Sequence, residues 1–280
     1  MNLAVRVLVG LLGVVACAAA PAMTAAQDAK PVLNRAPTAK DWTTISKLPD
    51  WSGVWLPDHP DPKEMARRTK ANPAPWTEKA AARIAKQEAA RNAGHPDNIF
   101  ANCLPQGMPS WVMISNNAME IAFTPGKIYI LGESDGNRLR RIYTDGRPHP
   151  ADPDPTFFGH SIGHWEGDTL VVDTVGIAPQ VFLAIGEATG VPNNGDMHVV
   201  ERIRLTAPDV LTDTMVITAP HVLTKPWTTS RLFNRTRRRD YDIVEGVCLQ
   251  GAFNEDVDQN GDSVFTPQVM RDDGIRAPLK

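Results

Sequence analysis

The sequence predicts a single all-β domain in which an antiparallel meander closes into a barrel or folds into a sandwich, after one short N-terminal helix. Three observations predict this fold class. From residue 119 onward, short runs of β-branched and aromatic residues alternate with turn signals. The connections between these runs are tight, which suits antiparallel neighbours. No helical pattern interrupts the series, and about 250 residues after processing suit one domain.

The first expected elements of the domain are a strand and a helix. Residues 51–56 form a short aromatic and β-branched run between two prolines, which is typical of a strand. Residues 77–92 are rich in strong helix formers and predict the only helix of the mature chain. Thr77 is placed to cap the start of this helix, and Gly94 is placed to end it.

A series of strands makes up the rest of the domain. Turns that contain Gly126 and Gly167 separate hairpin partners. The expected strands are 119–123, 127–131, 139–143, 161–165, 169–175, 198–205, 210–218, 227–234 and 241–247. A meander of this length is expected to close into a barrel or to fold into two packed sheets, because few edge strands are then left unpaired.

Two carboxylates interrupt the apolar faces of these strands. Alternation along 198–205 places Glu201 among apolar residues, and alternation along 169–175 does the same for Asp173. A buried carboxylate needs a partner, because unpaired burial of a charge costs several kcal/mol. The candidate partners are Arg141, Arg202 and Arg204. Such carboxylates either form structural ion pairs inside a barrel or line a polar ligand-binding interior.

The N-terminal residues are typical of an export signal. A short basic start is followed by an apolar run, which is too short to span a bilayer, and then by small residues. We expect cleavage near Gln27, with lipid attachment at Cys17 as the alternative route. The expected boundaries are 1–26 for the signal peptide, 27–49 for a loosely held Pro-rich leader and 50–280 for the β-rich domain. The protein is therefore expected to be periplasmic or secreted, without a membrane span.

Removal of the signal leaves two cysteines, Cys103 and Cys248. In an oxidising compartment a disulfide between them is the simple expectation. Its long loop would stabilise the fold by on the order of 4 kcal/mol in the chain-entropy description. A thiol nucleophile beside a histidine is the alternative.

The charge of the chain bears on its partners. A net charge of -3 and a pI of about 6.2 argue against a nucleic-acid partner. The basic run at 235–239 does not change this expectation, because it is interpreted as a solvated strand end or loop.

Two neighbouring segments, 143–150 and 159–168, gather three of the seven histidines with several carboxylates. Histidine titrates nearest to physiological pH, so this clustering supplies acids and bases together. The expected catalytic residues are His160, His164, Tyr143 and Asp173: a histidine removes a proton, and Tyr143, Asp173 or a second histidine holds the opposite charge. The expected binding residues are Asp145, His149, Trp165, His198, Glu201 and Arg202.

This pattern favours a lyase, isomerase or dehydratase that acts on a small apolar or aromatic molecule inside the barrel, without a cofactor. The sequence has no nucleophile elbow, Gly-rich phosphate loop or zincin helix, which argues against the common hydrolase and nucleotide chemistries. The alternative is a non-catalytic ligand-binding or envelope protein. In that case the histidines hydrogen-bond the backbone and hold the Pro-rich loop at 145–155.

A His-ligated metal site is a second alternative. On a strand, His160 and His164 point the same way but lie roughly 13 Å apart at about 3.3 Å per residue. They share an ion only if Gly163 bends the chain, or if each joins a distant ligand such as His149 or His198. We therefore expect no metal. If one is bound, its ligands come from these four histidines, and zinc, iron and copper all suit them.

The acidic segment 256–262 imitates the start of a calcium loop. Pro267 occupies the position of the required bidentate glutamate, and no helical pattern flanks the segment. We expect an Asx-rich turn here.

Four blocks of sequence carry a resemblance to a known family. They are residues 102–109 (NCLPQGMP), 141–155 (RIYTDGRPHPADPDP), 159–174 (GHSIGHWEGDTLVVDT) and 223–227 (LTKPW). Together they resemble an uncharacterised family of exported bacterial proteins, which implies export and a β-rich single domain and carries no catalytic assignment. Separately, Gly53 and Trp55 look like the Gly-x-Trp opening of lipocalin-type barrels, which implies a lipocalin-like closure.

Overall fold

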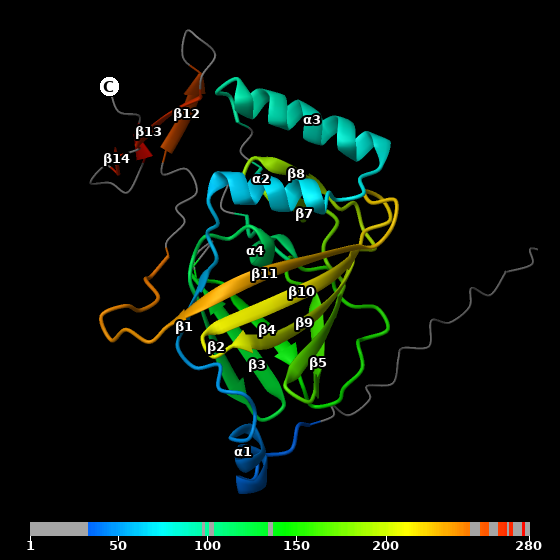
Figure 1. Ribbon diagram of the computed structural model, residues 1–280, viewed down its shortest axis with the longest axis vertical. Helices are drawn as coiled ribbons and strands as arrows, with labels where there is room; N and C mark the ends of the chain where they lie inside the picture. Colours follow the sequence, from blue (N-terminus) through cyan, green and yellow to red (C-terminus); the bar gives the residue numbers. More distant parts are fainter. Residues whose placement is uncertain are drawn as a thin grey trace, which may run out of the picture. The chain divides into compact units, whose positions relative to one another are not determined.

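The computed structural model describes residues 33–96, 99–100, 104–133 and 137–246, and the backbone of short strands beyond residue 252 (Figure 1). The expected export signal and Cys17, Cys103 and Cys248 lie outside the described residues. The chain divides into a unit of Met1–Ala36 and a unit of Pro37–Lys280. The second unit contains the entire barrel.

Nine strands form a closed barrel, which confirms the predicted fold class. They are β1 (Val54–Pro57), β2 (Met119–Thr124), β3 (Lys127–Gly132), β4 (Leu139–Tyr143), β5 (His160–Glu166), β6 (Thr169–Val175), β9 (His198–Ala207), β10 (Val210–Thr218) and β11 (Trp227–Thr236). Around the barrel the order is β1-β11-β10-β9-β6-β5-β4-β3-β2, and the pairing of β1 with β2 closes it.

One neighbouring pair departs from the predicted antiparallel meander. β4 and β5 run parallel, with Ile142 beside Ser161 and Tyr143 beside Ile162. A parallel pair needs a crossover of about a dozen residues or more, and the Pro-rich segment 144–159 is long enough to provide it. The prediction that all neighbours are antiparallel is therefore wrong at this point.

Strand assignment needs two further corrections. The expected strand 241–247 does not form in 241–246, the part of it that the structure describes. The sequence analysis also missed β7 (Phe182–Gly186) and β8 (Thr189–Pro192), an antiparallel pair outside the barrel sheet, because their glycines weaken the strand signal.

The C-terminal segment contains two short pairs of strands. β12 (Phe253–Val257) pairs with β13 (Ser263–Pro267), and β14 (Val269–Met270) pairs with β15 (Arg276–Ala277). The expected Asx-rich turn covers residues 256–262; its first two residues belong to β12, and residues 258–262 lie outside the described residues.

The expected helix forms as α3 (Glu78–Asn92). The Thr77 hydroxyl accepts a hydrogen bond from the Ala80 N–H at 3.4 Å, and Gly94 follows the helix with a φ of 88°. Both predicted boundaries of this helix are therefore confirmed.

Three additional helices correct the expectation of a single one. They are α1 (Ala39–Ile45), which lies in the expected leader, α2 (Pro62–Ala71) and α4 (Ser110–Met113). α2 begins where the Asp61 carboxylate accepts hydrogen bonds from the N–H groups of Lys63 and Glu64, with Pro62 at the first helical position. None of the helices in the described part of the chain has the length and apolar character needed to cross a membrane.

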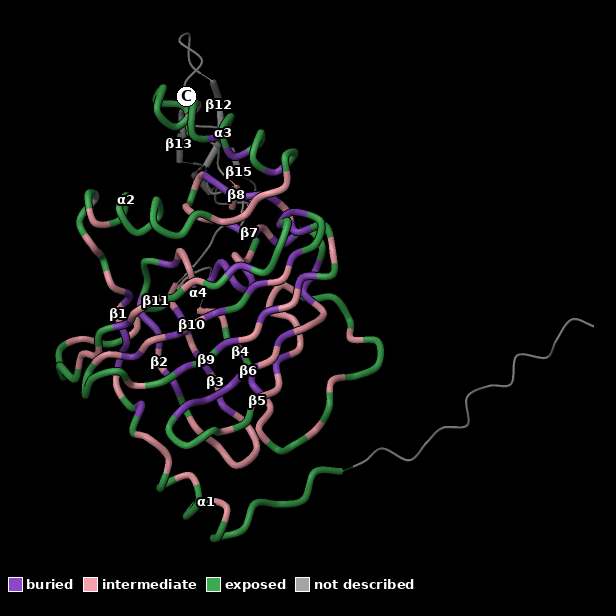
Figure 2. Tube along the Cα trace, turned by 45° about the vertical axis from the view of Figure 1, so that its right-hand side comes forward, coloured by how far each residue is buried: buried purple, intermediate pink, exposed green. Residues whose placement is uncertain are grey.

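Buried residues are spread along the barrel strands, interspersed with more exposed ones (Figure 2). Along β10 the burial alternates, and Leu211, Met215 and Ile217 are almost fully buried. A cluster of Trp51, Phe123 and Trp165 packs beside the β2–β3 and β5–β6 turns, with ring centroids between 5.2 Å and 5.8 Å apart. The barrel therefore has a packed apolar core.

A polar cluster is buried within this core. Glu201 is 0% exposed, which confirms that a carboxylate lies on the apolar face of β9. Arg140 binds both carboxylate oxygens of Glu201, from Nη1 at 2.7 Å and from Nη2, and Nη2 also donates to the hydroxyls of Ser161 and Thr174. This arrangement is a buried bidentate ion pair with two further hydroxyl acceptors, although Nε of Arg140 has no hydrogen-bond partner in the described part of the chain.

The partner of Glu201 differs from the candidates chosen by sequence. Arg141, Arg202 and Arg204 are all exposed. Arg141 directly follows Arg140, and successive side chains of a strand point to opposite faces. Arg140 therefore points into the barrel and Arg141 points out of it.

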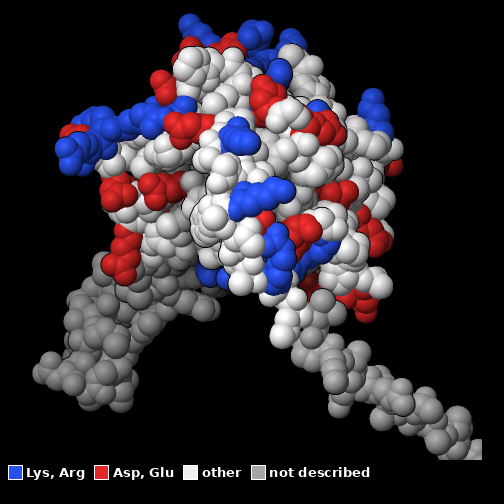
Figure 3. Space-filling view, turned by 90° about the horizontal axis from the view of Figure 1, so that it is seen from below, with Lys and Arg blue, Asp and Glu red and all other residues white. Residues whose placement is uncertain are grey.

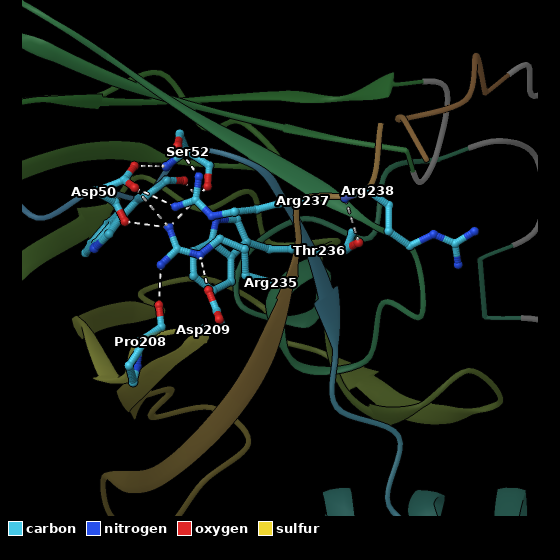
Figure 4. A network of polar contacts seen from close by, with 10 residues as sticks. Asp50, Ser52, Pro208, Asp209, Arg235, Thr236, Arg237 and Arg238 are labelled. Carbon is cyan, nitrogen blue, oxygen red and sulfur yellow. Dashed lines mark hydrogen bonds and ion pairs between the residues drawn. The ribbon is translucent and has the colours of Figure 1, made fainter. Parts of the chain in front are cut away.

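Arg235 connects the start of β1 to the turn between β9 and β10 (Figure 4). Its guanidinium contacts Asp209 at 2.9 Å and Asp50 at 3.6 Å, and it lies 4.7 Å from the ring centroid of Trp55. The side chain of Arg235 is only 5% exposed, whereas that of Arg238 is 69% exposed. The expectation of a solvated basic run is therefore wrong for Arg235.

Charged side chains of both signs are interspersed over the face shown in Figure 3. This face has no continuous basic surface of the kind that binds nucleic acid.

Candidate acid-base site

Five of the residues nominated from the sequence meet on the outer surface of the barrel. They are Tyr143 at the end of β4, His149 in the β4–β5 connection, His160 at the start of β5, Asp173 in β6 and His198 at the start of β9. Strand register explains the meeting, since Asp173 lies opposite Ile162 in β5 and Val200 in β9. His160 and His198 are each two residues from those partners, so they are diagonal neighbours of Asp173 on the same face.

His149 links the members of this cluster. Its Nδ1 lies 2.8 Å from Nδ1 of His160, and its Nε2 lies 3.3 Å from Oδ1 of Asp173. Nε2 of His198 lies 2.8 Å from the same carboxylate oxygen. Asp173, His149 and His160 form a chain that we term the histidine relay.

The carboxylate determines the hydrogen-bond roles in the histidine relay. An ionised Asp173 can only accept, so Nε2 of His149 carries a proton and donates it. Nδ1 of neutral His149 is then an acceptor, and Nδ1 of His160 donates to it. Nε2 of neutral His160 therefore keeps a lone pair, which is the form of imidazole that acts as a base.

The surroundings of His160 favour its neutral form. Burial lowers the pKa of His160, and the positive charge of Arg147, with that of His149 whenever its ring is protonated, acts in the same direction. The ring of Tyr143 stacks on that of His160, with centroids 5.2 Å apart and planes inclined by 19°. At neutral pH His160 is thus a proton acceptor with its lone pair at Nε2.

Arg147 is a part of the site that sequence reasoning missed. Its guanidinium lies 4.2 Å from the centroid of the Tyr143 ring, and it pairs with Asp145 at 2.6 Å. This pairing holds the pKa of Asp145 below its usual value. The sequence offered one indication of this role: Arg147 lies within the His-rich segment, two residues after the predicted Asp145.

The histidine relay faces solvent rather than the barrel interior. The side chains of Asp173 and His198 are 42% and 41% exposed, and that of His149 is 19% exposed. Val172 and Thr174, the strand neighbours of Asp173, are 0% exposed and point inward. The expectation that Asp173 lies in an apolar wall is therefore wrong, and so is the expectation of a site inside the barrel for these residues.

The other nominated residues have different surroundings. His164 is 67% exposed and contacts Glu166 at 3.3 Å, and Arg202 pairs with Glu166 at 2.8 Å. Trp165 packs in the aromatic cluster, and Glu201 is enclosed in the barrel core. His164 does not join His160, because four residues along a strand span roughly 13 Å.

Metal binding finds little support in the geometry of the cluster. Within the part of the chain that the structure describes, no group of three or more His, Cys, Asp or Glu side chains is placed to hold a metal ion. Both ring nitrogens of His149 already take part in hydrogen bonds with protein groups.

Comparison with known proteins adds little to these observations. The sequence matches no family model and no curated protein. Among solved structures, the chain is similar to a protein described as "REP1-NXSQ fatty acid transporter", with a TM-score of 0.32 and 8% identity over 67% of this chain and 97% of that chain. A similarity at this level carries no argument about function.

Proposed function

We propose that the protein is an exported β-barrel enzyme that transfers a proton on a small apolar or aromatic molecule, in a reaction of lyase, isomerase or dehydratase type. The observation that carries the proposal is the histidine relay. Its hydrogen bonds determine which ring nitrogen of His149 carries the proton, and they leave the Nε2 lone pair of His160 free. Export is supported by the sequence of residues 1–26.

The neighbouring side chains supply the remaining parts of such a reaction. His160 removes the proton, and the imidazolium that forms is stabilised through His149 by the charge of Asp173. Arg147 places a positive charge beside the Tyr143 ring, where it stabilises negative charge that develops on the substrate. Because proton transfer by one positioned group contributes about 100-fold to 10,000-fold in rate, this assignment predicts large effects of substitution.

Exchange of substrate protons with solvent tests the proposal directly. The protein is incubated in D2O with a panel of small aromatic and aliphatic carbonyl compounds and alcohols, and deuterium incorporation is followed by NMR. We expect incorporation into at least one compound, a loss of about 100-fold or more in His160→Gln, and a smaller loss in His149→Gln. Because the pKa of His160 is lowered, the rate should be half-maximal at a lower pH than for an ordinary histidine, whose pKa is about 6.5.

His164→Gln is the matched control, because His164 lies on the same strand and outside the relay. It should exchange at the wild-type rate. Equal rates in wild type and His160→Gln would falsify the assignment of His160 as the base.

A non-catalytic ligand-binding or envelope protein is the second candidate. It is favoured by the position of His149 in the β4–β5 connection, where its bonds to His160 and Asp173 hold that loop against the sheet. In that case His160→Gln alters stability or ligand affinity and no exchange is seen with wild type. Stoichiometric metal that is lost on replacing His149, His160 or His198 would instead indicate a metalloprotein.

A further inference from the structure

A cavity of about 460 Å³ lies between α2, α4 and the first half of β11. It arises from incomplete strand pairing: β1 pairs with β11 only at positions 233–236, so 227–232 lack a β1 partner. Asn72 of α2 donates to the carbonyl of Thr228 at 2.7 Å and so takes the place of a strand neighbour. The cavity therefore lies beside the half of β11 that lacks a β1 partner, and none of its lining residues belongs to the histidine relay.

Two buried donors in the lining of this cavity lack acceptors. Nε of Arg231 and Nε1 of Trp227 are both inaccessible to solvent and have no hydrogen-bond partner. Trp227 is only 8% exposed, and the printed bond of Arg231 is a long one, from Nη2 to the carbonyl of Ser115 at 3.4 Å. A buried donor without an acceptor costs about 1 to 3 kcal/mol, and more when it is charged.

Nearby carboxylates do not neutralise Arg231. Asp213 lies opposite it in the β10–β11 ladder, but burial and the charge of Glu201 raise the pKa of Asp213 well above its usual value, which favours the neutral carboxyl. Asp58 pairs with Arg68 at 2.9 Å. Among the described residues, no ion pair within 4.0 Å involves Arg231. Desolvation lowers the pKa of Arg231, and the charge of Asp58 opposes this from a greater distance.

Part of the lining offers apolar contact, and the remainder is polar or charged. The apolar part of the lining includes Met65 of α2, Met113 of α4, Ile114 directly after α4, Ile185 of β7, and Trp227. Its volume lies within the range of about 300 to 1,000 Å³ that is typical of small-molecule sites. The Asp58 carboxylate also lines the cavity and disfavours a second negative charge on an occupant.

We propose that this cavity binds a small monocarboxylate with an apolar body. The carboxylate accepts hydrogen bonds from the terminal nitrogens of the Arg231 guanidinium, and the apolar body packs against Met65, Met113 and Ile185. A guanidinium matches the geometry of a carboxylate with two parallel hydrogen bonds. The ligand thereby places a negative charge beside Arg231.

Calorimetric titration of the full mature chain tests this inference. The probes are 2-naphthoate and octanoate, each compared with its neutral amide, which has almost the same shape. We expect at least one acid to bind about tenfold or more tightly than its amide. In Arg231→Gln the preference for the acid should disappear.

Arg67→Gln is the matched control, because Arg67 lines the same cavity but is already paired with Glu64 at 2.7 Å. The dissociation constant of the acid in this variant should stay within about twofold of the wild-type value, apart from a change that depends on salt concentration. Since Arg231→Gln removes a buried unpaired charge, the ligand-free variant should also melt at a temperature equal to or above that of wild type.

Three outcomes would overturn the proposal. They are failure of both acids to bind wild type, equal affinity for acid and amide, and an acid preference that persists in Arg231→Gln. Arg231→Lys serves as a second variant if the glutamine protein does not fold, and it should retain a weaker preference for the acid because the charge remains and the planar fork is lost. Solvent exchange at the histidine relay is measured separately, so failure of one assignment leaves the other intact.

Discussion

Asp213 is a carboxyl group whose protonated form the barrel core favours. It is 3% exposed, and its pKa is raised first by desolvation and then by the negative charge of Glu201, while Arg140 acts in the opposite direction. Between the unfolded pKa of about 3.9 and the raised folded pKa, the folded chain holds one proton more than the unfolded chain. The free energy of unfolding therefore falls as the pH rises through this interval.

Asp213→Asn should remove this pH dependence, because an amide has no proton to lose. We expect the variant to gain stability relative to wild type as the pH rises from about 4 toward neutrality. Urea unfolding at a series of pH values measures the difference. Asp240→Asn is the control: Asp240 is 71% exposed and its pKa is lowered by Arg238, so any change should be small and of opposite sign. Parallel stability curves for wild type and Asp213→Asn would contradict the assignment.

At the scale of elements, the docking of α4 on β7 depends on one hydroxyl group. Ser110 is 0% exposed; its Oγ donates to the carbonyl of Phe182 at 2.6 Å and accepts from the N–H of Ala184 at 2.9 Å. Removal of the hydroxyl leaves two buried backbone groups without this partner. The Ser110 hydroxyl therefore joins the short helix α4 to the two-stranded sheet of β7 and β8.

Ser110→Ala should destabilise the protein by about 1 to 3 kcal/mol, because a buried backbone donor and acceptor lose their partner. Chemical denaturation measures this change. Ser46→Ala is the control, since the Ser46 hydroxyl makes an exposed bond to the carbonyl of Thr43 and its loss should cost less than about 0.5 kcal/mol. A cost for Ser110→Ala no larger than that of the control would show that α4 is held mainly by apolar packing.

At the scale of the whole molecule, the predicted export and the predicted disulfide are linked. If residues 1–26 direct export, the mature chain begins near Gln27 and holds Cys103 and Cys248 in an oxidising compartment. Intact-mass analysis and non-reducing peptide mapping of the exported protein should show this start and a crosslink between the two cysteines. Retention of residues 1–20, or two freely alkylated thiols, would contradict the prediction; a diacylglyceryl mass on Cys17 would select the lipid-attachment route.

The sequence by itself determined the features that depend on near neighbours. Alternation placed Glu201 on the buried face of β9, glycine turns defined the hairpins, and Thr77 and Gly94 set the limits of α3. These features are local, because strand periodicity, turn conformation and helix capping each depend on a few adjacent residues.

Only the tertiary structure decided which distant residues meet. The parallel pairing of β4 and β5, the choice of Arg140 as partner of Glu201, and the contact of His149 with both His160 and Asp173 depend on register between strands far apart in sequence. A shift of one residue in register turns each side chain to the opposite face, so the same sequence motifs are compatible with an inner or an outer site. The outward position of Asp173 therefore follows from the assembled barrel, as does the cavity beside β11, where strand pairing ends.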